Sequence, residues 1–119
     1  MQFTESHEWI QVDGDIGIIG ITAHAQKELG EVVYVELPLN GKVLQTAQEA
    51  AVLESTKAAS DVYAPVAGQV IAVNEQLKNN CDLINRFPES EGWLFKIKIA
   101  NLSDLEMLMG RDEYLRLVN

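Results

Sequence analysis

Short apolar segments separated by turn-forming residues recur along this chain, and they restrict its fold more than any other feature. The segments are rich in Val, Ile, Leu and Ala, and Gly, Pro, Asn or Asp commonly stands between them. The strands predicted from this pattern cover residues 9–12, 16–21, 31–37, 48–55, 58–63, 68–73 and 93–99. Short strands joined by Gly and Pro turns are typical of a β-sandwich or barrel, so we expect a mainly β fold.

Two segments indicate how the sheets are built. Asp13-Gly14 supplies the positive φ of a tight turn, so the strands on its two sides are predicted to form a hairpin. In 93–99 every odd-numbered residue is apolar, while Lys96 and Lys98 lie between them. This alternation predicts that Trp93 and the odd-numbered residues after it form one buried strand face.

Two other parts of the chain follow a helical pattern. Thr22 can cap a helix over 23–29, and Gly30 can end it in a left-handed conformation. Near the C-terminus, Ser103 and Glu106 have the spacing of a capping box, and a second helical stretch covers 112–118. We therefore expect a single domain over residues 1–119, with a C-terminal helical segment at about 103–118.

The composition argues against several classes of function. The 18 acidic and 9 basic residues give a net charge of −9 without any cluster of Lys or Arg, so neither nucleic acid nor an anionic membrane is an expected partner. The single cysteine, Cys81, excludes an internal disulfide and a multi-cysteine metal site. No apolar run approaches the roughly 20 residues of a membrane-spanning helix, and residues 1–6 do not look like a signal peptide. We expect a cytoplasmic protein.

Residues 54–61 contain the strongest candidate for a functional side chain. They lie between two predicted strands and hold one lysine, Lys57, among small and polar residues. A lysine amine is a poor catalyst unless it is desolvated, and no bulky apolar residue flanks this one. An exposed hairpin tip favours covalent modification instead. The alternative is a charged loop residue without a specific role.

The chain resembles the glycine cleavage system H-protein family in four separated blocks. They lie within residues 6–9, 20–33, 54–74 and 83–98. In the third block, Glu54-Ser55-Thr56-Lys57-Ala58 matches the segment in which a lysine of that family carries lipoic acid in amide linkage. The chain departs from the family at Glu28, where several relatives have histidine, and at Glu89, where an aromatic residue is common.

The resemblance implies a lipoyl-domain-like barrel-sandwich of two small antiparallel sheets, with a lipoyl-binding core at about 16–99 and the modified lysine at one hairpin. Such domains consist of two similar halves related by a quasi-two-fold axis. The segments 38–43 and 65–70 share the pattern Pro-x-x-Gly-x-Val and agree with this arrangement.

The function that the resemblance implies is that of a carrier and not of an enzyme. Lipoyl-Lys57 would accept the aminomethyl group from a pyridoxal-phosphate glycine decarboxylase and present it to a tetrahydrofolate-dependent aminomethyltransferase. Dihydrolipoamide dehydrogenase would then reoxidise the lipoyl group with FAD and NAD. A lipoate ligase, or a lipoyl or octanoyl transferase, would attach the cofactor.

The resemblance also places Glu8, Ser60 and Asp61 near a groove that shelters the loaded arm. An acidic groove can hydrogen-bond a protonated amine. The alternative for each residue is an ordinary carboxylate or hydroxyl that only shapes its strand. His7 and His24 lie far apart in sequence without metal-ligand spacing, so we expect structural roles for them and no metal site.

Two other carrier functions are considered. The protein would be a lipoate relay if it handed its lipoyl group to the acyltransferase subunits of 2-oxoacid dehydrogenases, and the sequence does not separate this role from glycine cleavage. A biotin carrier of the same fold is disfavoured, because biotinylated lysines usually lie between methionines and Lys57 lies between Thr56 and Ala58.

Overall fold

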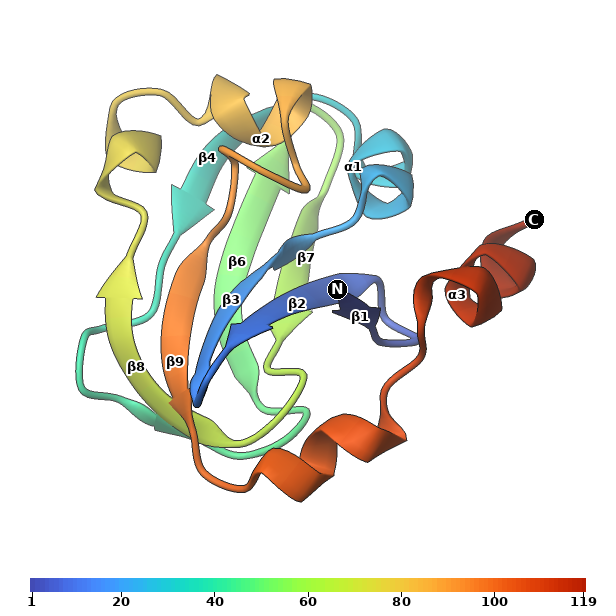
Figure 1. Cartoon of the computed structure of the whole chain (residues 1–119). Coiled ribbons are helices and arrows are strands. Elements are labelled where there is room, and N and C mark those ends of the chain that lie inside the picture. The colour runs from blue at the N-terminus through green and yellow to red at the C-terminus, as the bar shows by residue number, and fades with distance from the viewer.

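A computed structural model describes all 119 residues and shows two antiparallel sheets that enclose a common core (Figure 1). The larger sheet has the strand order β1-β2-β3-β9-β8-β5, and the smaller has the order β4-β6-β7. The strands are β1 (Gln2–Phe3), β2 (Glu8–Asp13), β3 (Ile16–Ile21), β4 (Val32–Glu36), β5 (Val43–Leu44), β6 (Glu49–Ser55), β7 (Ala59–Tyr63), β8 (Gly68–Val73) and β9 (Phe95–Ile99). The predicted mainly β fold is confirmed, although the sheets form a sandwich and do not close into a barrel.

Five helical segments connect or follow the strands. They are α1 (Ala23–Leu29), the 3₁₀ segment η1 (Glu75–Lys78), α2 (Asp82–Arg86), the 3₁₀ segment η2 (Leu102–Met107) and α3 (Arg111–Val118). The predicted limits of α1 are confirmed: the Thr22 hydroxyl accepts the Ala25 N–H, and Gly30 follows the last turn with φ 87°. The short helix α2 was not predicted, and its Asn85 side chain exchanges two hydrogen bonds with the Val32 backbone of β4.

The C-terminal cap differs from the prediction. Asn101, and not Ser103, precedes η2, and its side chain accepts the Ser103 N–H. Ser103 lies inside a 3₁₀ turn, where it donates its hydroxyl to Asn101. The capping box fails because the chain tightens into a 3₁₀ helix directly after Asn101 and leaves Ser103 no place before its first turn.

One hydrophobic core joins the two sheets. Phe95, Ile97 and Ile99 of β9 are buried in it as the alternation predicted. The prediction was wrong for Trp93, because β9 begins only at Phe95. Trp93 is half-buried, and its neighbour Leu94 is fully buried instead. Trp93 packs instead against a smaller cluster of Phe3, Trp9 and Tyr114 on the other face of the large sheet.

The two segments that share the Pro-x-x-Gly-x-Val pattern lie side by side. Val43 of β5 pairs with Gln69 of β8, and the Val70 N–H donates to the Lys42 carbonyl. Val43 and Val70 occupy equivalent positions of the two segments, 27 residues apart, and so do Lys42 and Gln69. Exchanging equivalent positions converts the pair Val43–Gln69 into the pair Val70–Lys42, as expected of two strands related by a two-fold axis. The repeat detected in the sequence therefore corresponds to a symmetric contact in the fold.

Candidate functional site

Lys57 lies at the tip of the hairpin that joins β6 to β7. The strands pair up to Glu54 and Ala59, and the exposed connection between them lies at the end of the molecule that also carries α1 and α2 (Figure 1). The Lys57 amine takes part in none of the chain's ion pairs. The predicted exposed tip is confirmed.

The Ser55 hydroxyl organises this tip. It accepts hydrogen bonds from the N–H groups of Lys57 at 3.1 Å and Ala58 at 3.0 Å, and it donates to the Ala58 carbonyl at 3.1 Å. A Ser side chain that bonds backbone groups two and three residues later stabilises a turn. The backbone before Lys57 is also anchored, because the Thr56 N–H donates to the Glu31 carbonyl.

Gly30 adjoins the lysine stem, which sequence reasoning missed. It has φ 87° and ψ −161°, a conformation that only glycine adopts readily. A Cβ atom at this position would lie 2.8 Å from Lys57 Cε, so the absence of a side chain leaves room for the stem. The sequence signalled only that Gly30 ends a helix; its contact with Lys57 follows from the packing of α1 against the hairpin.

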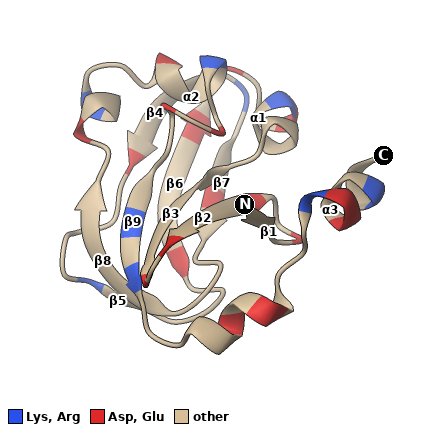
Figure 2. Cartoon of the chain, in the orientation of Figure 1, with Lys and Arg blue, Asp and Glu red and all other residues tan.

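Glu54 and Ala58 flank the tip in different ways. Glu54 is exposed near the end of β6, where it pairs with Tyr34 on one side and Ala59 on the other. Ala58 is exposed and contributes backbone groups to the turn. Figure 2 shows Lys and Arg on several elements, including α1 and α2 at the end of the molecule that carries this tip.

Glu8 is a buried carboxylate at the start of β2. Only 2% of its surface is exposed. Its Oε1 accepts the hydroxyls of Thr4 and Ser6 at 2.5 and 2.6 Å, and its Oε2 accepts the Tyr63 N–H of β7 at 3.2 Å. Burial raises the pKa of Glu8 above its ordinary value, while these hydrogen bonds oppose the rise. Glu8 thus links β2 of the large sheet to β7, an edge strand of the small sheet.

Ser60 and Asp61 lie exposed on β7, the strand that donates to Glu8. Asp61 lines a cavity with Lys42 and Val52, whereas Glu8 lines a separate one with Tyr63. Glu8 therefore meets β7 at Tyr63, while Asp61 lies on the same strand but lines a different cavity. Their part in sheltering an arm stays a prediction.

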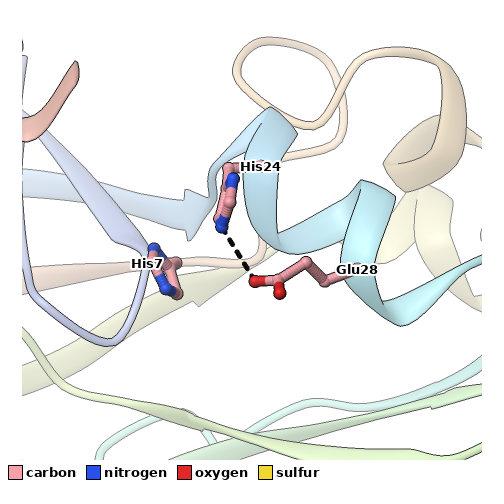
Figure 3. A group of neighbouring side chains, drawn as sticks. All are labelled: His7, His24 and Glu28. Carbon is pink, nitrogen blue, oxygen red and sulfur yellow. Dashed lines mark ion pairs between the residues drawn. The ribbon is translucent and has the colours of Figure 1, made fainter. Parts of the chain in front are cut away.

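The two histidines, which the sequence separates, meet in the fold. The rings of His7 and His24 have centroids 4.7 Å apart, and His24 Nε2 lies 2.8 Å from Glu28 Oε1. His7 precedes β2, while His24 and Glu28 lie one turn apart on α1 (Figure 3). The pairing of β2 with β3 places the loop before β2 beside the start of α1, and this brings together two histidines that are far apart in sequence.

None of the helices is both long and apolar enough to cross a membrane.

Comparison with known proteins identifies relatives over nearly the whole chain. The family model described as glycine cleavage H-protein matches residues 1–119. The glycine cleavage system H protein of Caulobacter vibrioides is 53% identical over 114 residues, which cover 96% of this chain and 94% of that protein. The corresponding protein of Halothermothrix orenii is 50% identical over 98% of this chain and 91% of its own length.

A solved structure agrees with these matches. The crystal structure of a glycine cleavage system H protein from Mycobacterium marinum superimposes with a TM-score of 0.88 at 31% sequence identity. The match covers 97% of this chain and 93% of that one.

Proposed function

Since this chain belongs to the glycine cleavage H-protein family, whose members are lipoyl carriers and not enzymes, we propose that Lys57 carries its lipoic acid in amide linkage. The observation that supports this proposal is the hairpin tip, which holds a free lysine amine outside the sandwich. The matching segment Glu54-Ser55-Thr56-Lys57-Ala58 forms that tip.

The residues around Lys57 fit an attached group. The Ser55 hydroxyl holds the two N–H groups that follow Thr56, so the backbone that presents the amine is ordered. Gly30 leaves the stem free of a neighbouring side chain. A ligase can therefore reach the amine from solvent, and the hairpin remains a fixed base for the extended arm.

The function that we propose is the transfer of the glycine-derived aminomethyl group between enzymes. Lipoic acid on Lys57 supplies a disulfide that takes up this group together with two electrons. The chain contributes a tether, which raises the local concentration of the group at each enzyme that it meets. The partners are glycine decarboxylase, aminomethyltransferase and dihydrolipoamide dehydrogenase. We also propose a cytoplasmic location, since the free thiol of Cys81 fits a reducing compartment.

Glu8, Ser60 and Asp61 are the residues that we propose to shelter the arm. Glu8 supports this, because Oε2 accepts only the Tyr63 N–H and can accept a second donor from an ammonium group. In Glu8→Gln, protein loaded from glycine and separated from the decarboxylase should release formaldehyde and ammonia faster than wild type. Equal release rates would refute the proposal that Glu8 shelters the loaded arm.

Lys57→Arg tests the attachment site. Arginine keeps the positive charge but offers no amine for this amide, so the variant should fold normally and gain no lipoyl mass with a lipoate ligase. Lys42→Arg, which replaces an exposed lysine elsewhere, is the control and should be modified as wild type is. A lipoyl group on the Lys57→Arg variant, found by peptide mapping, would refute the assignment.

Reconstitution with the three partner enzymes tests the transfer itself. Lipoylated wild type should support decarboxylation of glycine, and Lys57→Arg should not. If lipoyl-Lys57 forms but glycine is not consumed, the lipoate-relay function becomes the better account.

A further inference from the structure

We propose that His7, His24 and Glu28 bind a divalent cation of the zinc type (Figure 3). The three side chains come from two elements, the loop before β2 and the helix α1, and they point toward one another. The site shares no residue with the Lys57 tip.

The distances suit a metal centre after small movements of the side chains. One ligand atom from each residue lies within 4.8 Å of the others. In a tetrahedral zinc site with bonds of about 2.0–2.2 Å, neighbouring ligand atoms lie about 3.3–3.6 Å apart. The His24–Glu28 pair, at 2.8 Å, has to open by about 0.5–0.8 Å, while the longer separations have to shorten. The His24 and Glu28 side chains, which are 33% and 64% exposed, have room to rotate to these positions.

The ligand types favour zinc over calcium or magnesium. Two imidazole nitrogens and one carboxylate oxygen are a set that zinc uses with three protein ligands, and water takes the fourth position. His24 and Glu28 lie at i and i+4 of α1, on the same face of the helix. Because Glu28 is exposed, the fourth position faces solvent.

A hydrogen-bond chain positions His7 for this role. His7 Nδ1 lies 2.8 Å from the Tyr114 hydroxyl, which lies 2.7 Å from the Thr22 hydroxyl. With Nδ1–H donating to Tyr114, Nε2 carries the lone pair that a metal requires. Tyr114 is fixed in turn by stacking on Phe3 with centroids 4.7 Å apart.

The backbone of His7 adds a second indication. Its φ is 73°, in the left-handed region that residues other than glycine adopt uncommonly, with Asn, Asp and His the most frequent among them. Such a conformation persists only where neighbouring contacts enforce it, and it commonly marks a functional position. Here it directs the ring toward α1.

Zinc titration of the full-length chain by calorimetry tests the site. Wild type should bind one Zn²⁺ per chain. His7→Asn removes Nε2 but tolerates the left-handed backbone, and Glu28→Gln removes the charged ligand from an exposed position. Each of these variants, and His24→Ala, should weaken binding at least tenfold, since loss of even an outer partner costs about 10–100-fold.

Two further variants separate the site from general effects. Tyr114→Phe keeps the ring on Phe3 but removes the hydroxyl, and it should weaken zinc binding about tenfold. The melting temperature in chelator measures separately the stability lost with the two buried hydrogen bonds. Glu75→Gln removes an exposed carboxylate from another ion pair and should bind zinc as wild type does.

The proposal is overturned if wild type binds no stoichiometric zinc, which would leave His24 and Glu28 as an ion pair only. It is also overturned if His7→Asn and Glu28→Gln bind zinc with wild-type affinity, because the metal would then lie elsewhere on the acidic surface.

Discussion

Ser55→Ala should loosen the attachment hairpin and slow modification of Lys57. The substitution removes the two hydrogen bonds that the hydroxyl accepts from Lys57 and Ala58 and the one that it donates to the Ala58 carbonyl. A typical intramolecular hydrogen bond contributes about 0.5–1.5 kcal/mol. Because this turn is exposed, water replaces part of the loss, and we expect the free energy of unfolding to fall by about 1–2 kcal/mol in total.

The same loss changes how often the turn has the conformation that a ligase recognises. If the ordered turn is destabilised by about 1.4 kcal/mol relative to disordered ones, its population falls up to about tenfold. The kcat/KM of lipoylation at Lys57 should therefore decrease by about three- to tenfold. Urea unfolding measures the first effect, and a time course of intact mass with a lipoate ligase measures the second.

Ser103→Ala is the matched control for this prediction. It removes an exposed hydroxyl that donates to Asn101 in η2, at the end of the molecule opposite the hairpin (Figure 1). It should lower stability by about 1 kcal/mol or less and leave lipoylation unchanged. Wild-type lipoylation kinetics in Ser55→Ala would show that the hydroxyl does not organise the tip.

Two further predictions concern stability. Phe95→Ala removes a fully buried ring from the core and should lower the free energy of unfolding by about 3–5 kcal/mol. Lys98→Ala, on the exposed face of β9, should change it by less than about 0.5 kcal/mol. Similar urea midpoints for the two variants would contradict the assigned faces. Burial holds the pKa of Glu8 above its ordinary value of 4.5, so the protonated carboxyl contributes stability that is complete below pH 4.5 and is lost as the pH rises through the folded-state pKa. Glu8→Gln has no carboxyl that titrates at this position. Urea unfolding at pH 4 and pH 7 should therefore show that the variant gains stability relative to wild type at the higher pH. A difference in unfolding free energy between variant and wild type that does not change with pH would refute the burial effect.

Much of the fold and the attachment site could be predicted from the sequence, because their signals are local. Asp13-Gly14 defines a hairpin turn through its backbone preference, and Thr22 and Gly30 define the limits of α1 through capping. Lys57 could be placed at a tip because apolar strands flank a short polar segment. The resemblance to a carrier family then pointed to the chemistry of that lysine.

Other features depend on which strands pack together, and no local pattern encodes them. The pairing of β2 with β3 brings His7 to His24, and Tyr114 of α3 reaches both His7 and Thr22, which lie 107 and 92 residues earlier in the chain. Asn85 becomes a structural anchor only because α2 lies against β4. Local preferences thus determine turns, caps and alternation, whereas the burial of Glu8 and the meeting of the histidines arise from long-range packing that only the tertiary structure decides.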